Sequence, residues 1–378
     1  MSKLLWHSCV PWAPSGYGMQ TANWVQKLAD MGHEVTISTY WGLQGAPTLW
    51  NGITILPGYG QNYCSPSLSQ HAQMVQPDLI ITLGDIWVMD PNLIRELPIA
   101  HWLPVDCRPQ SLADRSVLHA TGAQLMAMSM WGRDRMRDAG FDPVYVPHGI
   151  DTDLFSPPGD RKALRESLGV DGNFVIGANM ANNDAIRKAI PEIMLAFARF
   201  CEDHPEAILS LHTGVHTEGG QDLEAVAENL GIVDKVRVVD QYRYSCGLVS
   251  PQDIADWYGV CDVLVATSYG EGFGLPIVEA QACGTPVITT DASSMTELNP
   301  LGFHVGGEPF WNGVHKGWWT KPYIGQIHAA LQQAHESRDA VDRDKLRDFA
   351  LDYALDRVAE KYMGPAVTEL AERVKKKG

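Results

Sequence analysis

The chain has 378 residues and a formal net charge of −16 at pH 7; this length predicts two domains of Rossmann size, and the negative charge disfavours nucleic acid as a partner. Hydrophobic residues make up 45% of the sequence, yet no apolar run approaches the roughly 18 residues of a membrane span, and the start MSKLLWHSCVPWAP is a poor match to a signal peptide. We therefore expect a soluble, cytoplasmic protein.

Apolar runs alternate with amphipathic stretches over the first 150 residues, which predicts a parallel sheet covered by helices on both faces. The predicted strands are LLWHSCV, HEVTIST, DLIITLG, IAHWLPV, LMAMS and PVYVP, with a helix near 21–31 after the first. The pattern stops in VPHGIDTDLFSPPGD, a stretch rich in Pro, Gly and Asp that is typical of a linker. We expect an N-terminal Rossmann-like domain over 1–155, with the boundary near Ser156.

The second half repeats this organisation and predicts another doubly wound α/β sheet. Its predicted strands are FVIGANM, AILSLHTG, KVRVVD, DVLVATS and TPVITTD, with a helix over 190–202. Apolar residues recur at three- and four-residue spacing after Gly317, so we expect helices and no further strand from there on. The domain is predicted over 156–345, followed by C-terminal helices over 346–378.

The segment DVLVATSYGEGFGLPIVEAQACGTPVITTD predicts one βαβ unit. A buried strand over 263–268 leads into a glycine-rich loop whose backbone can approach a ligand closely. Pro276 suits the first turn of a helix and Gly284 its C-terminal end, so the helix is predicted over 276–283. The N-terminus of this helix lies at the carboxyl end of the sheet, where free N–H groups form an anion site.

Two glutamates flank this anion site. Glu271 lies in the loop and Glu279 lies inside the helix. A carboxylate beside a phosphate would repel it, so both should bind neutral groups farther out. Vicinal hydroxyls of a sugar or ribose, which donate two hydrogen bonds to one carboxylate, meet this requirement.

The segment resembles the EGFGLPxxEAxAxGxPVI signature of the retaining glycosyltransferases of family 4. The resemblance implies the GT-B fold, in which two Rossmann-like domains face a cleft and C-terminal helices pack back across the N-terminal domain. It also implies that Glu271 binds the donor sugar and Glu279 the nucleotide ribose. The backbone of Phe273, Gly274 and Leu275 would meet the diphosphate.

The family also uses a basic pair, Arg and Lys, to neutralise the leaving diphosphate. In ANNDAIRKAIPEIMLAF, Lys188 falls at the family's lysine position, while Arg187 is adjacent rather than several residues earlier. The usual Arg after a Gly at the end of the first strand of the C-terminal domain is missing. Lys188 and Arg187 are our candidates for this role.

Several N-terminal residues are further candidates. The stretch PSGYGMQTANWVQKLADMGHEV resembles the family's opening loop, in which Gly16 and Gly18 would approach the donor phosphate or the acceptor. HWLPVDCRP places His101 and Asp106 at an expected strand end, His101 as a donor contact and Asp106 as a contact to sugar or acceptor. The N-terminal domain would bind the acceptor.

We expect no metal site. The seven cysteines contain no CxxC pair, which favours free thiols. His212 and His216 lie in strand and loop rather than on one helix face, and Asp151 and Asp153 are interpreted as turn chemistry.

The resulting hypothesis is transfer of a hexose-type sugar from a nucleotide diphosphate sugar, with retention of configuration and no required metal or cofactor. A GT-B-fold epimerase, a phosphorylase and a non-catalytic nucleotide-sugar-binding protein are alternatives. The acceptor (glycan, lipid-linked sugar, small molecule or protein) and the base stay open. The tail Arg373 to Lys377 would allow at most weak peripheral membrane contact.

Overall fold

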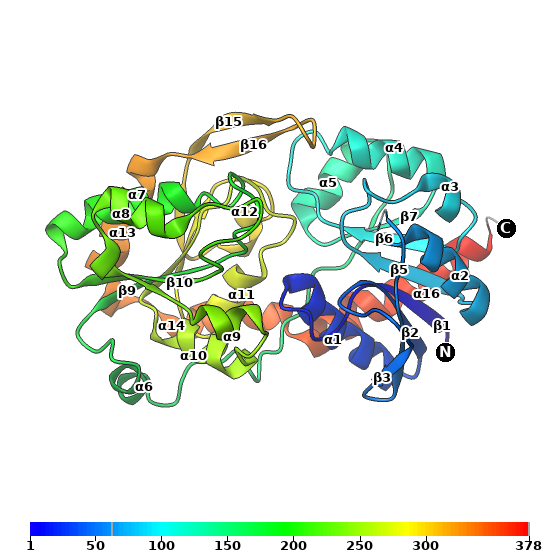
Figure 1. The fold of residues 1–378 in the computed structure, drawn as a ribbon, viewed down its shortest axis with the longest axis horizontal. Coiled ribbons are helices and arrows are strands. Elements are labelled where there is room, and N and C mark those ends of the chain that lie inside the picture. Colours follow the sequence, from blue (N-terminus) through cyan, green and yellow to red (C-terminus); the bar gives the residue numbers. More distant parts are fainter. Residues whose placement is uncertain (62, 377–378) are drawn as a thin grey trace. The chain divides into compact units, whose positions relative to one another are not determined.

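The computed structural model describes residues 1–61 and 63–376. The chain forms two compact units (Figure 1). The first comprises residues 1–149, 311–318 and 355–378, and the second comprises residues 150–310 and 319–354. The units therefore change at 149/150 and 354/355 rather than at the expected 155/156 and 345/346. Lys377, the last residue of the basic tail, lies outside the described residues.

The first unit contains an eight-stranded sheet in the order β3-β4-β2-β1-β5-β6-β7-β8. All its neighbouring strands are parallel except the β3–β4 pair. Its elements are β1 (Lys3–Cys9), α1 (Gly16–Asp30), β2 (Glu34–Trp41), β3 (Thr48–Trp50), β4 (Ile53–Leu56), α2 (Ser65–Val75), β5 (Leu79–Leu83), α3 (Pro91–Ile94), β6 (Ile99–Leu103), α4 (Leu112–Thr121), β7 (Gln124–Ala127), α5 (Met130–Asp138) and β8 (Val144–Tyr145).

The second unit contains a six-stranded parallel sheet in the order β11-β10-β9-β12-β13-β14. Its strands are β9 (Phe174–Asn179), β10 (Ala207–His212), β11 (Val236–Val238), β12 (Val263–Ala266), β13 (Val287–Thr290) and β14 (Phe303–Val305). Its helices are α6 (Arg161–Ser167), α7 (Ile190–Asp203), α8 (Leu223–Leu230), α9 (Gln241–Ser245), α10 (Pro251–Val260), α11 (Leu275–Ala282), α12 (Met295–Leu298), α13 (Ile324–Glu336) and α14 (Arg343–Ala350).

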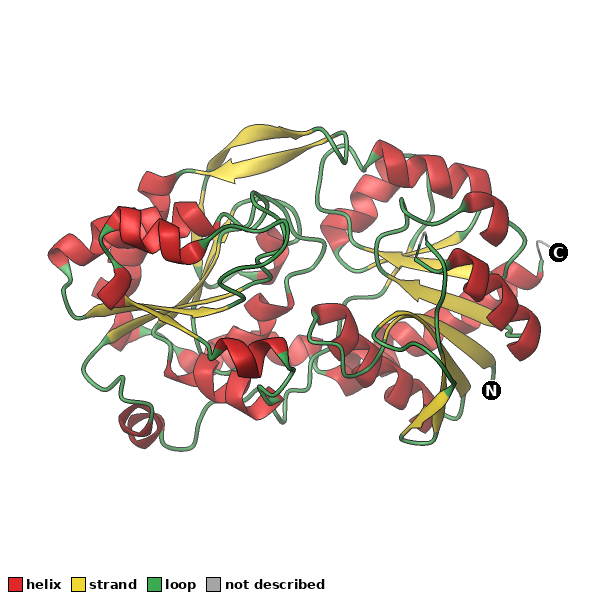
Figure 2. Cartoon of the chain, in the orientation of Figure 1, coloured by secondary structure: helices red, strands yellow, loops and turns green. Residues whose placement is uncertain are grey.

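Helices cover both faces of this second sheet (Figure 2). Helices α7, α8 and α13 lie on one face, and α10, α11 and α14 lie on the other (Figure 1). Alternate strand residues such as Ile176, Leu209 and Val265 pack with Phe197 and Leu331 into one core. This burial on both faces explains why the strands are continuous apolar runs.

The chain returns to the first unit at its C-terminal end. Helices α15 (Leu355–Val358) and α16 (Gly364–Lys375) belong to that unit, and α16 packs on β5 and β7. The expected return of the C-terminal helices is thus confirmed. Among the described residues, no helix is long and apolar enough to cross a membrane.

The expectation of helices alone after Gly317 was wrong. Strand β16 (Gly317–Pro322) pairs with β15 (Gly307–Asn312) in a two-stranded hairpin outside both sheets. The side chains of Trp311 and Trp318 meet edge to face, with ring centroids 5.1 Å apart. Aromatic cross-strand pairs of this kind stabilise a hairpin, and β-propensity is high in WWT.

Candidate donor site

The candidate site lies at the carboxyl end of β12, where the chain enters the loop before α11. Gly274 caps the helix with φ +107°, a conformation that L side chains rarely adopt. A Cβ atom at this position would lie 2.8 Å from Cδ1 of Ile277. Helix α11 then begins at Leu275, with Pro276 in its first turn, and Gly284 follows its end with φ +76°. The predicted helix is confirmed, displaced by one residue.

Two serines that follow β13 hold the loop in place. The hydroxyl of Ser293 accepts a hydrogen bond from the Glu271 N–H at 2.9 Å. The hydroxyl of Ser294 lies 2.8 Å from the Glu271 carbonyl and 2.5 Å from that of Phe273. Both serines are buried. The backbone of the loop is therefore fixed by side chains from the neighbouring strand end.

The carboxylate of Glu271 is surrounded by donors. Nζ of Lys188 contacts Oε1, Nη1 of Arg187 lies 3.3 Å from Oε2, and Oγ of Ser268 donates to Oε1 at 2.6 Å. Burial by itself would raise the pKa of Glu271, but the charges of Lys188 and Arg187 outweigh it and lower the pKa to about 2. Glu271 is thus ionised, and the group of three carries a net charge of about +1.

A short turn places the two cations. The carboxylate of Asp184 accepts hydrogen bonds from the N–H groups of Ile186 at 2.8 Å and Arg187 at 3.0 Å. The carbonyl of Arg187 in turn accepts from the N–H of Tyr269 at 2.7 Å, which ties this turn to the loop after β12. Arg187 and Lys188 therefore act on the same carboxylate although they are adjacent in sequence.

Glu279 is a buried carboxylate with one unpaired oxygen. Glu279 is 1% exposed, and every other residue of α11 except Pro276 is buried. The hydroxyl of Tyr258 donates to Oε2 at 2.8 Å, while Oε1 has no hydrogen-bond partner among the described residues. Burial raises the pKa of Glu279 to about 7, against the hydrogen bond from Tyr258, which lowers it.

A line of hydrogen-bonded polar side chains leads from the buried Glu279 to the partly buried Asn179 and His212 across the ends of the strands. Asn179, the last residue of β9, donates to the Tyr258 hydroxyl at 2.7 Å. Nδ1 of His212, the last residue of β10, lies 3.1 Å from Oδ1 of the Asn179 side-chain amide. The line follows the carboxyl edge of the sheet, where open α/β sheets bind ligands.

The other two backbone candidates lie at the start of α11. Phe273 is 3% exposed, and its ring packs edge to face on Tyr353. Leu275 is the first helical residue and is also buried. The N–H groups of the first helical turn point out of the helix end that carries the partial positive charge.

Three further candidates, Gly16, Gly18 and His101, lie in elements of the first unit. Gly16 opens α1, and Ser15 caps it by accepting from the Gly18 N–H at 3.1 Å. A Cβ atom on Gly18 would lie 2.2 Å from the Ala13 carbonyl oxygen, so close packing accounts for this glycine. His101 lies in the middle of β6 rather than at a strand end. It is fully buried, with Nδ1 2.7 Å from the Thr82 hydroxyl oxygen, so its expected position at a strand end was wrong, and the donor contact stays a prediction.

Asp106 follows β6 and lies with two other aspartates. Asp85, Asp106 and Asp114 line one pocket together with Ser111 and His315. Burial, followed by the charges of Asp85 and Asp106, raises the pKa of Asp114 well above its ordinary value. The structure thus adds two carboxylates that the sequence did not single out.

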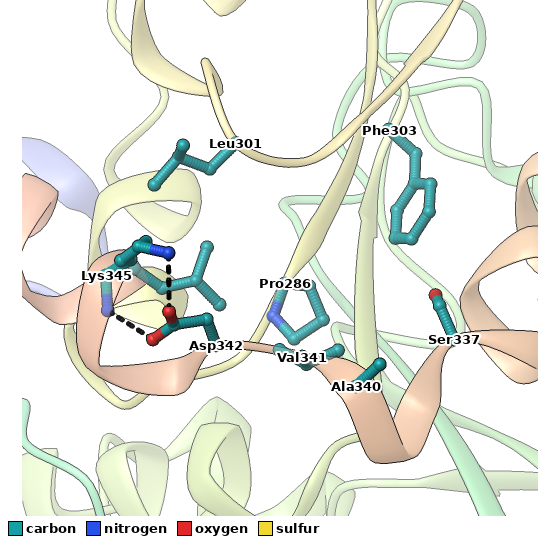
Figure 3. Close-up of a pocket in the computed structure, with 9 residues that line it drawn as sticks. Pro286, Leu301, Phe303, Ser337, Ala340, Val341, Asp342 and Lys345 are labelled. Atoms are coloured by element: carbon teal, nitrogen blue, oxygen red, sulfur yellow. Dashed lines mark hydrogen bonds and ion pairs between the residues drawn. The ribbon is translucent and has the colours of Figure 1, made fainter.

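A larger hollow of the second unit, with a volume of about 240 Å³, lies on another part of its surface (Figure 3). Its lining is mostly apolar, and Asp342 pairs with Lys345 at its rim at 2.8 Å. The lining residues are Pro286, Leu301, Phe303, Ser337, Ala340, Val341, Asp342, Lys345 and Leu346. Since Pro286 precedes β13 and Phe303 opens β14, this hollow lies at the amino ends of the strands, away from Glu271.

His212 and His216 contact different residues and do not share a partner among the described residues. Asp151 and Asp153 lie in a turn. His212 faces Asn179, whereas His216 is exposed and pairs with Asp222 at 3.5 Å. Asp151 accepts from the N–H groups of Asp153 and Leu154, each at 3.0 Å, which confirms the turn.

The sequence did not identify Asn179, Tyr258, Ser268, Ser293 or Ser294 as parts of the site. Ser268, Ser293 and Ser294 lie at or just after predicted strand ends, and this position could have identified them as candidates for the site. Tyr258 lies on α10, and nothing in the local pattern distinguishes it from core aromatics.

Comparisons with known proteins agree with this geometry. Residues 161–350 match the family model described as "Glycosyl transferases group 1". D-inositol 3-phosphate glycosyltransferase of Geodermatophilus obscurus is 33% identical over 184 residues, which are 47% of this chain and 38% of that protein. The lipopolysaccharide core biosynthesis mannosyltransferase LpsB of Rhizobium meliloti is 30% identical over 155 residues, 40% of this chain and 42% of that protein. The aligned regions thus span less than half of these relatives.

Solved structures share the fold over almost the whole chain. Sucrose-phosphate synthase from Thermosynechococcus elongatus superposes with a TM-score of 0.77 at 17% identity, covering 97% of this chain and 99% of that one. Anabaena HepE in complex with UDP-glucose gives 0.64 at 18% identity, covering 100% and 99%. The fold is GT-B, as expected. Because the family model covers half of the sequence, including every residue of the candidate donor site, the chain belongs to the group 1 glycosyl transferases.

Proposed function

We propose that this protein is a glycosyltransferase whose second unit binds a nucleotide diphosphate sugar. The observation that carries the proposal is the buried Glu279, one carboxylate oxygen of which has no hydrogen-bond partner among the described residues. Glu279 lies on the helix that follows the loop in which Glu271 pairs with Lys188 and Arg187. A site for ribose, one for diphosphate and one for sugar would lie along this helix.

The diphosphate would bind at the N-terminus of α11. Two cations beside one carboxylate leave about one positive charge, and the helix end adds partial positive charge. A diphosphate with two negative charges would be partly neutralised there. As it leaves the sugar its charge grows, so Lys188 and Arg187 would stabilise the transition state more than the ground state.

The ribose would bind to Glu279. A buried carboxylate oxygen without a donor costs free energy, and this cost is recovered when a ligand supplies hydrogen bonds. Two vicinal hydroxyls supply two donors to one carboxylate. Tyr258 would hold Glu279 in place for this contact, since its hydroxyl donates to the other carboxylate oxygen and is itself held by a hydrogen bond from Asn179.

The sugar would bind to Glu271, with the acceptor attacking from the face that the diphosphate leaves. This route gives retention and needs neither a nucleophilic carboxylate nor a required metal, as in the retaining enzymes of family 4. The two cations that pair with Glu271 favour its ionised form, which suits it to accept hydrogen bonds from sugar hydroxyls rather than to donate a proton.

A hexose on UDP is the first donor to test, because Anabaena HepE is described in complex with UDP-glucose. Acceptor binding is proposed for the first unit, where Asp85, Asp106 and Asp114 line one pocket. Their carboxylates can accept hydrogen bonds from the hydroxyls of a polyol.

The experiment is a transfer assay with UDP-, GDP-, ADP- and dTDP-sugars against a panel of glycan, lipid-linked and small-molecule acceptors, with magnesium or with EDTA. We expect product with one nucleotide series, unchanged by EDTA, with the anomeric configuration of the donor by NMR. Inverted product or loss of activity with EDTA would contradict the mechanism. Isomerisation of the donor sugar without transfer would favour an epimerase. Cleavage that depends on phosphate would favour a phosphorylase, and tight nucleotide-sugar binding without turnover would favour a binding protein.

A further inference from the structure

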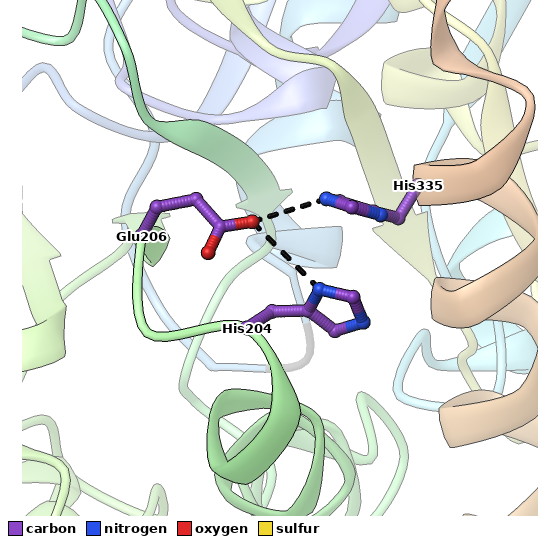
Figure 4. Close-up of side chains that lie close together, drawn as sticks. All are labelled: His204, Glu206 and His335. Atoms are coloured by element: carbon purple, nitrogen blue, oxygen red, sulfur yellow. Dashed lines mark hydrogen bonds and ion pairs between the residues drawn. The ribbon is translucent and has the colours of Figure 1, made fainter.

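Two histidines and one glutamate of the second unit converge at the end of the sheet opposite to the donor site (Figure 4). His204 follows the last residue of α7, Glu206 precedes β10, and His335 lies in the last turn of α13. One ligand atom from each lies within 4.8 Å of the others. Nε2 of His335 is 3.0 Å and Nδ1 of His204 is 3.7 Å from Oε1 of Glu206.

These distances suit a small divalent cation. Zinc binds imidazole nitrogen and carboxylate oxygen at about 2.0–2.2 Å, and tetrahedral angles then put neighbouring ligand atoms about 3.4 Å apart. The two ion-pair distances lie on either side of this value. Two histidines and one glutamate form a known zinc ligand set, and imidazole also suits cobalt and nickel.

The ring of His204 is already oriented for this role. Its Nε2 lies 2.7 Å from Oε1 of Gln332, and donation to this amide oxygen corresponds to the tautomer with the proton on Nε2. In a neutral ring, Nδ1 then presents its lone pair towards the carboxylate of Glu206. Both atoms are then available as ligands to one metal ion. A histidine that donates its second N–H to a carbonyl oxygen is the usual arrangement around a bound metal.

The surroundings also favour a cation. The two packed helices α7 and α13 both end at this cluster, and helix C-termini carry partial negative charge. The ring of Phe200 stacks on that of His204 with centroids 4.3 Å apart, and the ring of Phe174 meets that of His335 edge to face with centroids 4.9 Å apart. Both imidazole rings are therefore held by packing. The exposed Arg338 lies against the His335 ring, with Nη1 2.9 Å from Nε2, and it would have to swing into solvent.

We propose that His204, Glu206 and His335 bind one divalent cation of the zinc class, with the Gln332 amide oxygen holding the other ring nitrogen of His204. The ion would join the ends of α7 and α13, and water would complete its coordination because the side chain of Glu206 is 41% exposed. The site is structural and separate from sugar transfer, for which no metal is required in our account.

The test uses the full chain without a histidine tag, in a Cys246→Ser background that removes an exposed thiol. Zinc is titrated by calorimetry, and cobalt is followed by its visible absorption. We expect one zinc ion per chain with a micromolar or lower Kd, a tetrahedral cobalt spectrum and a raised Tm. His335→Gln and Glu206→Gln should weaken binding at least about tenfold, and Gln332→Ala about tenfold.

The matched control is His328→Gln, which removes a histidine from the same helix but outside the cluster. It should leave zinc affinity unchanged. Glu206 lies at the surface, so Glu206→Gln keeps the test valid if His335→Gln folds poorly. Zinc binding unchanged by Glu206→Gln, or no stoichiometric binding by the parent chain, would overturn the proposal.

Discussion

The hydroxyl of Tyr258 donates a 2.8 Å hydrogen bond to one carboxylate oxygen of Glu279, and no described residue reaches the other oxygen. Both side chains are buried, and Tyr258 also accepts from Asn179. The hydrogen bond fixes the carboxylate on α11 while leaving acceptor capacity on one side. This is an arrangement that a ligand with hydroxyl donors would complete.

Tyr258→Phe should therefore weaken both folding and nucleotide binding. Loss of one buried hydrogen bond to a charged group should lower the free energy of unfolding by about 1.5–3 kcal/mol. Nucleotide affinity should fall several-fold because the Glu279 carboxylate loses its fixed orientation. Urea denaturation and calorimetry measure the two effects. Tyr323→Phe, at an exposed tyrosine of the same unit, is the control; equal effects of both variants would refute the role of Tyr258.

Nucleotide-sugar affinity should depend on pH through Glu279. Burial raises the pKa of Glu279 to about 7, so the accepting carboxylate is mostly protonated at pH 6 and mostly ionised at pH 8. Affinity should therefore rise about tenfold between these values. A nucleotide sugar is used because its diphosphate does not titrate in this range. Glu279→Gln should remove the pH dependence, and an unchanged slope would contradict the assignment.

Glu271→Gln should separate turnover from binding. The variant keeps the size of the side chain but leaves Lys188 and Arg187 without their carboxylate, which should cost about 2–4 kcal/mol of stability. Turnover should fall by more than tenfold, while affinity for a free nucleoside diphosphate should not fall, because a negative charge near the phosphates is lost. Glu228→Gln, at an exposed glutamate of α8, is the control. Normal turnover in Glu271→Gln would exclude the sugar contact.

Gly274→Ala tests the loop geometry. The residue has φ +107°, and the added methyl group would lie 2.8 Å from Ile277. Gly231 ends α8 with φ +68° and has open space around it, so Gly231→Ala measures the backbone strain alone. We expect Gly274→Ala to cost about 1–3 kcal/mol more than Gly231→Ala in thermal or urea denaturation. Equal costs would mean that the close packing at Gly274 is unimportant.

The first unit should lose stability in acid. Burial lowers the pKa of His7 to about 4 and those of His101 and His148 to about 3, from 6.5. Their neutral forms are favoured on folding, so this contribution is present above pH 6.5 and is lost as the pH falls towards these values. At pH 5 each of these three histidines should lower the free energy of unfolding by about 1–2 kcal/mol. Hydrogen exchange of β6 measures the loss.

Two groups with opposite pKa shifts, His101 and Glu279, should change the acid stability in opposite directions. His101→Gln should reduce the acid sensitivity of β6, because it removes one of the groups that must take up a proton on unfolding. Glu279 acts in the opposite direction in the second unit: its pKa is raised in the folded state, so its contribution falls as pH rises from 4.5 to 7. Protection factors of the β6 amides, which correct each exchange rate for its intrinsic pH dependence, should be lower at pH 5 than at pH 7.5. Equal protection factors at the two pH values would contradict the prediction.

The sequence predicted those features that local residue types determine. Gly274, Pro276 and Gly284 mark both ends of α11, and the apolar runs mark the central strands of both sheets. It missed the short β3, β4 and β14, in which few residues can display a pattern. The β15–β16 hairpin was missed because its Trp311–Trp318 pair depends on cross-strand packing rather than on periodicity.

Within the site, the sequence predicted the residues of one continuous loop and helix. It could not predict the line from His212 through Asn179 and Tyr258 to Glu279, because these residues come from four elements that only the sheet order brings together. The predicted position of His101, at a strand end, was also wrong, since His101 lies within β6. A histidine in an apolar run can be buried at the middle of a strand when a partner such as Thr82 satisfies one ring nitrogen.

The most direct test of the account measures whether Glu279 binds the ribose. The nucleoside diphosphate that binds best and its 2′,3′-dideoxy analogue are titrated by calorimetry into the parent protein and into Glu279→Gln. We predict that removing the two hydroxyls weakens binding to the parent protein at least tenfold but has little further effect in Glu279→Gln, which is a coupling of about 1.4 kcal/mol or more. Equal losses in both proteins would place the ribose elsewhere and contradict the proposed donor site.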